Sequence, residues 1–556
     1  MKFVLIFFLA FGAFAAKQDN ADRLIRRLYL DIQDRLPSVS EYQSAKERLT
    51  SNEAYRSLVD DLMADPRFSQ NLSRRIITHY APPLSERDPH PVMYRRLAKH
   101  IEKTYAKPKD DFRVFINDMW KADGISFKNQ MLLFYNKTEG SKEMASRFTE
   151  KTLGITIGCA ECHDHKFYPD LKHQMFWSLA TFFEGMNKQY IESSVDLKLL
   201  DRKVGESRKS RLALGDEYED VLYWIKQEKE GKNIYDELTS KERMGQYFDD
   251  ESESEEMMEG IPLLAPQLYI YEGEKLITRL NIKYTVEGKE YRARPRLPFG
   301  SDRPIYKTET PREYLANWIA YKKPHYFARA TTNWISHWLL GRGLVMPAND
   351  VYGNLGEQGL RLDAFAKKFR DSNFQVHHLV RELLNSSIYK MASAEKSDEE
   401  GFVYFKSRKF RHLTGAQVLN ILFAEQELDL EEMGDLAALY DLQQEKTALT
   451  EELFPASLSD SEAYYRGSLS QALFLTSNER VMELIDLKAK NWHKYAKENG
   501  RENVIKQIFI SFYTRLPTDR ELVFFKVKLN EEKAYDQSGF FEMIWTIINS
   551  PEMRIY

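Results

Sequence analysis

The sequence predicts a mainly α-helical protein, a multi-helix scaffold with a helical repeat at its two ends and a small central β module. Three observations support this fold class. Apolar residues recur at helical spacing along most of the chain. A segment near the N-terminus matches one near the C-terminus. One central stretch alternates with a period of two. With 43% hydrophobic residues, the chain can build a large core.

The first residues have the pattern of a secretory signal peptide. Lys2 is followed by an apolar run that ends in small residues at Ala13 and Ala15. We expect residues 1–15 to be removed on export, which places the protein in the periplasm, in the cell envelope or outside the cell. The run is shorter than the roughly 20 apolar residues needed to cross a bilayer. We therefore expect no integral membrane span after cleavage.

The two ends of the chain carry a repeat. "LIRRLYLDIQDRLPSVSE" (24–41) matches "VIKQIFISFYTRLPTDRE" (504–521) at a constant shift of 480 positions. "LVDDLMADPRF" (58–68) matches "MIWTIINSPEM" (543–553) at a shift of 485. Each copy predicts a helix, an Arg-Leu-Pro turn, a second helix, and a third helix that ends near a proline. Similar amphipathic helices could arise independently, but the shared turn at matching register favours duplication.

The middle of the chain predicts two different segments. Residues 191–260 are strongly charged and predict a linker with a solvated helix and an acidic run at 248–260. Residues 261–298 predict a small β module of two or three strands, because 267–295 alternates in period two. Helical patterns return in the last part, residues 299–556.

The chain's two cysteines lie together in "GCAECHDHKFYP" (158–169). Cys159 and Cys162 are followed directly by His163. If the preceding helix continues through this stretch, both thiols and the imidazole lie on one side of it. C-x-x-C-H is the pattern of covalent c-type haem attachment. We therefore predict haem c bonded to Cys159 and Cys162, with His163 as a ligand of the haem iron.

The other axial ligand of the iron stays open. Its candidates are His165, His173 and Met175, which follow the motif closely. His173 and Met175 begin "HQMFWSLATFFEGM" (173–186), which predicts one apolar helix able to cover a haem.

The sequence leaves other chemistries open for the motif. A disulfide between Cys159 and Cys162 is compatible with an oxidising compartment. A zinc site could use both cysteines and His165. Three classes of function follow: an electron carrier, a cofactor-free secreted interaction scaffold, and a haem- or metal-dependent enzyme on envelope or polysaccharide material. No phosphate-binding loop, nucleophile elbow or H-E-x-x-H motif indicates a hydrolase.

The expected partner is a redox partner or envelope protein that the sequence does not identify. A polysaccharide is a further possibility, because the chain is rich in aromatic residues. A net charge of −4 gives no basic excess that would favour nucleic acid.

Three stretches carry a resemblance to a known family: "RRLYLDIQDRLPS", "TLGITIGCAECHDHKFYPDLKHQMFWSLATFF" and "PREYLANWIAYKKPHYFARATTNWISHWLLGRGLV". The chain resembles exported planctomycete-type proteins that join a cytochrome C-like domain, of the second type, to a planctomycete-specific domain. Both are domains of unknown function. The resemblance implies a cytochrome C-like domain in 16–190 and a planctomycete-specific domain in 299–556.

The resemblance also bears on single residues. Members read C-H-D-H at the motif, which singles out Asp164 and His165 and implies a second-shell or metal-binding part for His165. The chain departs from the pattern at Ser336, where members usually have Trp, and it lacks their P-S-H-P segment. The resemblance implies a haem-type motif at Cys159, Cys162 and His163, and the family has no settled biochemical activity.

Overall fold

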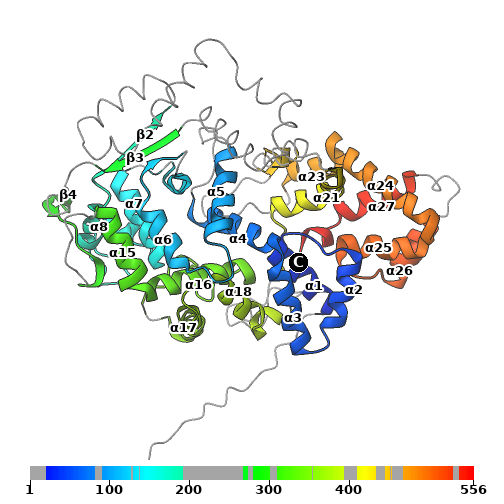
Figure 1. The fold of residues 1–556 in the computed structure, drawn as a ribbon, viewed down its shortest axis with the longest axis horizontal. Coiled ribbons are helices and arrows are strands. Elements are labelled where there is room, and N and C mark those ends of the chain that lie inside the picture. Colours follow the sequence, from blue (N-terminus) through cyan, green and yellow to red (C-terminus); the bar gives the residue numbers. More distant parts are fainter. Residues whose placement is uncertain are drawn as a thin grey trace, which may run out of the picture.

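The computed structural model describes residues 20–81, 91–191, 267–272, 280–300, 310–392, 410–433, 468–529 and 537–556, with short gaps at 127–128, 137, 139 and 354 and a few further residues at 442–453. These residues are mostly helical, which confirms the predicted fold class (Figure 1). The predicted signal peptide and nearly all of the predicted linker 191–260 lie outside the described residues. None of the described helices combines the length and apolarity that a membrane span requires.

Helices form most of the N-terminal part. They are α1 (Ala21–Gln33), α2 (Val39–Arg48), α3 (Asn52–Ala64), α4 (Pro66–Tyr80), α5 (Pro91–Thr104), α6 (Phe112–Lys121), η1 (Gln130–Tyr135), α7 (Gly140–Phe148), η2 (Thr149–Leu153), η3 (Gly158–Glu161) and α8 (His173–Ala180).

The C-terminal part is helical as well. Its elements are η6 (Pro298–Gly300), α15 (Pro311–Asn317), η7 (Trp318–Lys322), α16 (Pro324–Leu340), α17 (Gly356–Asp371), α18 (Val376–Leu384), α19 (Ser387–Lys390), α21 (Gly415–Met433), α23 (Leu469–Ser477), α24 (Glu479–Asn499), α25 (Arg501–Tyr513), α26 (Asp519–Lys528), α27 (Gln537–Asn549) and η8 (Glu552–Arg554).

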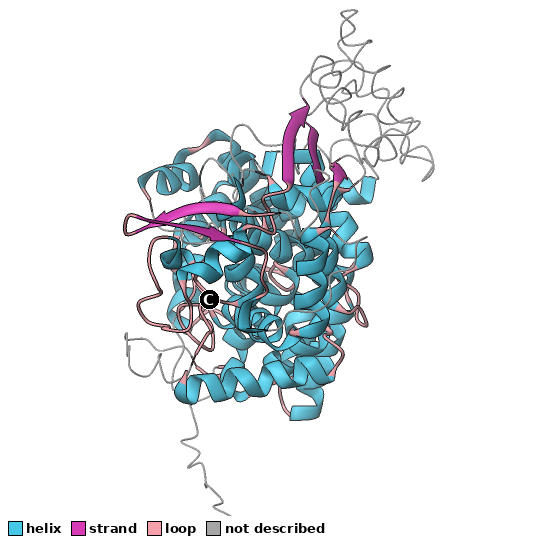
Figure 2. Cartoon of the chain, turned by 90° about the vertical axis from the view of Figure 1, so that its left-hand side faces the viewer, coloured by secondary structure: helices cyan, strands magenta, loops and turns pink. Residues whose placement is uncertain are grey.

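Strands occur where the period-two pattern predicts them, but they do not all pair with one another in one central β module. β4 (Ile282–Val286) and β5 (Lys289–Ala293) form a hairpin with positive φ at Glu287 and Gly288, as a type I′ turn requires. β3 (Gln267–Glu272) instead pairs with β1 (Gly124–Ile125) and β2 (Met186–Ile191) of the N-terminal part. Figure 2 shows the two small sheets at the surface of the helical body.

The main hydrophobic core draws on both predicted helical domains. It includes residues from Leu24 to Met391, together with Ile510 of α25, and aromatic side chains from each domain. Phe112 of α6, for example, stacks on Phe327 of α16 with ring centroids 5.9 Å apart. Helices α15 to α19 therefore share a hydrophobic core with the helices of the N-terminal part.

A second core joins the remaining helices of the C-terminal part. It includes residues from Leu413 to Tyr556 and one residue from the other end of the chain, Leu30 of α1. Its neighbours on the same helix, Leu28 and Ile32, belong to the main core. Helix α1 thus lies between the two cores and has apolar side chains in each.

The structure confirms the terminal repeat at the level of whole helices. The bounds of α1 and α2 reproduce those of α25 and α26 at the shift of 480, and α3 reproduces α27 at 485. In both copies the residue after the first helix has a positive φ, at Asp34 (60°) and at Thr514 (58°). Each copy is therefore the same three-helix module.

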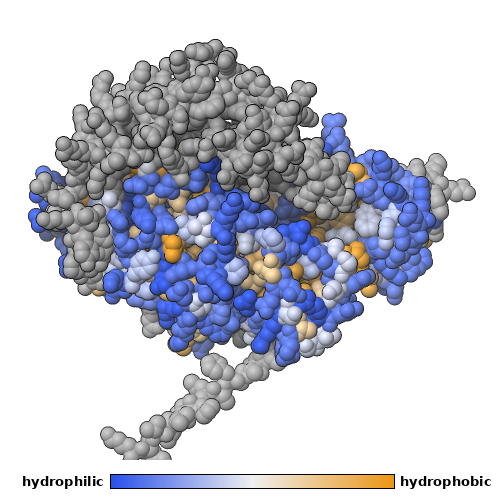
Figure 3. Space-filling view, in the orientation of Figure 1, coloured by the Kyte–Doolittle hydropathy of each residue, from blue (hydrophilic) through white to orange (hydrophobic). Residues whose placement is uncertain are grey.

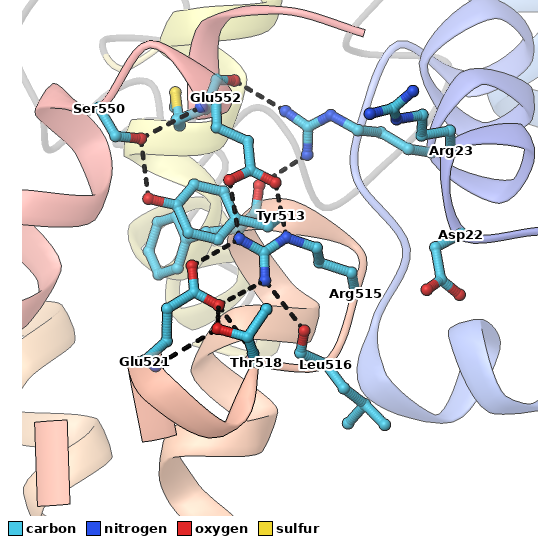
Figure 4. Close-up of polar contacts among 12 residues, drawn as sticks. Asp22, Arg23, Tyr513, Arg515, Leu516, Thr518, Glu521, Ser550 and Glu552 are labelled. Atoms are coloured by element: carbon cyan, nitrogen blue, oxygen red, sulfur yellow. Dashed lines mark hydrogen bonds and ion pairs between the residues drawn. The ribbon is translucent and has the colours of Figure 1, made fainter. Parts of the chain in front are cut away.

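The Arg-Leu-Pro turn of each module is closed by one ion pair. Arg35 binds Glu41 through two hydrogen bonds of 2.8 and 2.5 Å, and Arg515 binds Glu521 at 2.9 and 2.8 Å. Figure 4 shows Arg515 between Glu521 and Glu552. Each glutamate also completes a capping box at the start of the second helix. The pattern R-L-P-[ST]-x-x-E thus contains the ion pair and the capping box that the two turns share, while Glu552 adds a second ion pair to Arg515 in the C-terminal module.

Helix α1 also carries buried charged residues that bind the far end of the chain. Asp31, which is fully buried, accepts hydrogen bonds from Tyr389 (2.9 Å), Arg411 (2.9 Å) and Tyr556 (3.1 Å). Arg26 donates to the carbonyl groups of Phe512 (2.6 Å) and Met553 (2.7 Å).

Burial lowers the pKa of Arg26 to about 10, against the opposing effect of Glu552. The guanidinium therefore still carries its charge at neutral pH.

Replacing Asp31 should destabilise the whole molecule. Asp31→Ala leaves the buried Arg411 guanidinium without its carboxylate, a change that costs about 3 kcal/mol or more of unfolding free energy. Tyr556→Phe removes only one hydrogen bond to the same carboxylate and should cost about 1 kcal/mol. Urea denaturation followed by circular dichroism measures both variants. If the two variants lost equal amounts of unfolding free energy, the central role of Asp31 in this network would be contradicted.

The turn of the C-terminal module should make stability depend on pH. Hydrogen bonds from Arg515 lower the pKa of Glu521 from about 4.5 to about 2, against the opposing effect of burial. The pair therefore stabilises the fold above pH 4.5, and its contribution is lost as the pH falls through 2. We expect Glu521→Gln to lose about 1 kcal/mol at pH 7, and this loss to shrink in acid.

Thermal unfolding of wild type and variant between pH 7 and pH 3 measures this dependence. Glu542→Gln on α27 is the matched control and should leave stability unchanged at each pH. A loss in Glu521→Gln that stays constant over the range would argue against the ion pair as its cause.

Candidate functional site

The chain reaches the Cys-x-x-Cys-His motif after a helix that ends early. Helix α7 continues as η2 and stops at Leu153, because Gly154 takes a left-handed conformation (φ 65°). A Cβ atom at Gly154 would lie 2.4 Å from the Cγ2 atom of Val351, so only glycine fits there. The motif then begins in the short 3₁₀ turn η3. The expectation that one helix continues through Cys159 is therefore wrong.

The three residues predicted to hold haem are all exposed at the surface. Cys159 and Cys162 are free thiols, and His163 follows them in an exposed turn. The Nδ1 atom of His163 lies 2.7 Å from the carbonyl oxygen of Asp164. A carbonyl oxygen only accepts, so Nδ1 carries a proton, and in the neutral form of the ring Nε2 then has the free lone pair. Histidines that bind metals have this arrangement.

Asp164 fixes the loop that follows the motif. Its carboxylate accepts hydrogen bonds from the Nζ atom of Lys172 (2.9 Å) and from the backbone N–H of His173 (3.1 Å). The bond from Lys172, followed by that from the His173 backbone, lowers the pKa of Asp164. A negative charge here also favours the N-terminus of α8. Asp164 thus ties the motif to the helix after it.

His165 is buried, and both of its ring nitrogens are engaged by the protein. Nδ1 accepts the backbone N–H groups of Phe167 and Tyr168, each at 3.2 Å. Nε2 therefore carries the proton and faces the carbonyl oxygen of Thr156 at 3.2 Å. His165 clamps its own loop, and its part as an axial or second-shell ligand stays a prediction.

The two other axial candidates lie on α8. The Nδ1 atom of His173 lies 3.2 Å from the hydroxyl of Tyr284, and the His173 ring packs against Tyr291 at 5.0 Å. Met175 is half-buried against the main core. The helix predicted for 173–186 ends at Ala180, and the chain then turns into strand β2. Each axial candidate therefore contacts the protein itself, and its part as a ligand stays a prediction.

A shallow, open groove of about 400 Å³ lies beside Cys162. Its walls include Lys142, Trp177 and Tyr284. Trp177 stacks on Tyr284 with ring centroids 4.7 Å apart, and Lys142 pairs with Glu161 at 2.7 Å. The β4–β5 hairpin thus provides one wall. No motif in the sequence connects Tyr284 with Cys162, and only the fold brings both residues to one groove.

The C-terminal part holds the motif from its other side. The backbone N–H of Val351 donates to the carbonyl oxygen of Gly154 at 2.7 Å, and the Tyr168 hydroxyl donates to Asp350 at 3.3 Å. Burial raises the pKa of Asp350. Fully buried Asn333 on α16 fixes this loop through hydrogen bonds to Val345 and Ala348.

Ser336 lies one turn further along α16, buried and bonded to the carbonyl oxygen of Thr332 at 2.7 Å. This departure from the family pattern is therefore an interior position.

The zinc alternative finds no support in the part of the chain that the structure describes. Within that part, no group of three His, Cys, Asp or Glu side chains is arranged to hold a metal ion. His165, the expected third ligand, is engaged through both nitrogens as described above.

Comparison with known proteins places two family models on the chain. The model named PSCyt2, a protein of unknown function (DUF1549), matches residues 10–188. The model named PSD1, a protein of unknown function (DUF1553), matches residues 311–509. No curated protein and no solved structure matches. Residues 10–188 therefore belong to the planctomycete cytochrome C-like domain family and residues 311–509 to the PSD1 domain family, in that order along the chain.

Proposed function

We propose that the protein is an exported c-type haem protein that transfers single electrons to or from a partner. One observation carries the proposal: two exposed thiols stand beside a histidine whose Nδ1–H is held by a carbonyl group. That hydrogen bond leaves Nε2 of His163 able to bind iron. The name of the matched cytochrome C-like family and the signal-peptide pattern support the same function.

The donor set of the motif fits a covalently bound haem. Thioether bonds need two accessible thiols at this spacing, and both Cys159 and Cys162 are exposed. Iron ligation needs the neutral imidazole tautomer with its proton on Nδ1, which the Asp164 carbonyl group selects at His163. A haem bound here would supply the one-electron redox chemistry of its iron.

The surrounding residues would tune and orient that chemistry. The Asp164 carbonyl group fixes the ring of His163 and raises its basicity, which is one of the protein's influences on redox potential. The Asp164 carboxylate, through Lys172 and the start of α8, keeps this carbonyl group in place. Exposure of the motif gives a redox partner close access. The partner would be another redox or envelope protein.

Haem content tests the proposal. Protein exported by cells with active haem-attachment machinery should show a Soret band, and its intact mass under denaturing conditions should include one haem. Cys159→Ser/Cys162→Ser should lose this covalent mass, because no thioether bond can then form. His163→Gly should keep the mass but alter the spectrum, because only the iron ligand is removed.

Lys166→Ala, an exposed change in the same loop, is the control and should retain both the mass and the band. A colourless protein whose thiols are bonded only to each other would rule out the electron carrier. That result would favour the cofactor-free interaction scaffold with a Cys159–Cys162 disulfide.

A further inference from the structure

The β4–β5 hairpin has one face towards the helical body and one face towards solvent. Tyr284 of β4 lies opposite Tyr291 of β5, with ring centroids 5.4 Å apart, on the face that packs against α8. Side chains alternate between the two faces of a strand. Lys283 and Arg292 therefore point away from α8, and Arg294 follows directly after β5. These last three residues, all of them exposed, form what we call the basic hairpin face.

The positive charges of this face are not compensated within the described chain. Lys283 and Arg292 lie directly opposite each other across the hairpin. Like charges at such positions destabilise a strand pair, because their Cβ atoms are only about 5 Å apart. Among the residues that the structure describes, none forms an ion pair with Lys283, Arg292 or Arg294, and this includes Glu290 on the same strand as Arg292.

Protection of an exposed strand edge does not account for this arrangement. Charged side chains do prevent the edges of small sheets from pairing with other chains. Opposite charges across the two strands would serve that purpose, and they would also stabilise the hairpin. Two unpaired cations opposite each other are instead expected where a surface binds a negatively charged partner.

The other face of the hairpin connects it to the Cys-x-x-Cys-His motif. Tyr284 stacks on Trp177 with ring centroids 4.7 Å apart. The indole N–H of Trp177 donates to the carbonyl oxygen of Glu161, which directly precedes Cys162, at 3.0 Å. Thr285, an exposed residue of β4, lines the groove together with Cys162. A partner bound to the basic hairpin face therefore lies beside the motif.

We propose that the basic hairpin face binds an acidic patch on the surface of a protein electron partner, a proposal that rests on the function given above for the motif. Complementary charges speed the encounter of two proteins and fix their orientation. Most of the surface visible in Figure 3 is hydrophilic, with small separate apolar areas. Charge is therefore the property by which a partner distinguishes one part of such a surface from another.

The charges around the face favour a folded protein over a long polyanion. Glu287 in the hairpin turn and Glu290 on β5 are both exposed, so the positive area is short. The whole chain has a net charge of −4. These groups repel a polysaccharide or a bilayer of uniform negative charge. A protein surface can place cations of its own opposite the two glutamates.

Binding of an acidic protein probe tests the face. The probe is a blue-copper protein with an acidic surface patch, its copper replaced by zinc, which has no redox chemistry. Surface plasmon resonance should show that it binds the full-length exported protein, and more weakly as salt is added. Lys283→Glu/Arg292→Glu should lower the association rate constant at low salt at least about tenfold. The difference should shrink at high salt, because ions screen the charges.

Lys490→Glu/Lys494→Glu on α24 is the matched control. It changes the net charge by the same amount at two exposed lysines of another element, and should bind the probe like the wild type. Circular dichroism shows that both variants are folded, as expected for exposed positions. A control that loses as much binding as the hairpin variant overturns the proposal. So does a wild type that does not bind the probe.

Two further probes represent other anionic occupants. Dextran sulfate stands for an anionic polysaccharide, and phosphatidylglycerol vesicles stand for a membrane surface. Neither should show binding that Lys283→Glu/Arg292→Glu removes. If the hairpin variant loses binding to one of these probes and still binds the acidic protein, the face belongs to that other occupant and the protein partner is ruled out.

A haem-free variant separates a failure of this docking surface from a failure of the proposed function. Cys159→Ser/Cys162→Ser should bind the zinc-loaded probe like the wild type, because the basic hairpin face is unchanged. If the exported protein contains haem but the hairpin variant binds the probe undiminished, the docking surface is wrong and the function stands. If the protein is colourless but its binding depends on the hairpin charges, the acidic partner stands and electron transfer to it is ruled out.

Discussion

The buried carboxylate of Asp31 is the interaction on which the arrangement of this molecule depends. It lies on α1 and receives hydrogen bonds from Tyr389, Arg411 and Tyr556, the last of which is 525 positions away. A buried carboxylate is costly unless charge and hydrogen bonds compensate for it. Once it is placed in α1, the fold must bring these three groups to it, and the segments that carry them take fixed positions.

The same helix connects two cores that do not coincide with the two family matches. The PSD1 match covers 311–509, yet its residues up to Met391 belong to the main core and those from Leu413 belong to the second. Helix α1, inside the PSCyt2 match, contributes to both cores. The two family segments therefore share their interiors, and the C-terminal part also positions the motif through Val351 and Asp350.

The sequence predicts those structural features that are determined by residues close together in the chain. The terminal modules are predictable because a capping box and an Arg–Glu pair six residues apart fix each turn locally. The Cys-x-x-Cys-His motif can be recognised in the sequence for the same reason. The sequence does not predict that the helix ends at Gly154, because the side chain that leaves no room for a Cβ atom there belongs to Val351, nearly two hundred residues away. Pairing of β3 with β1 and β2, and the position of Tyr284 beside Cys162, likewise depend on tertiary contacts.

The bond between Asp31 and Tyr556 also has a consequence for how the chain reaches its native state. The two residues are 525 positions apart, so the carboxylate on α1 finds this partner only after all the intervening residues have been synthesised. Contacts of such long range make folding slow. Until those contacts form, the charged side chains of α1 that the native fold buries remain hydrated, so closure of the interior around Asp31 is expected to be a late step of folding.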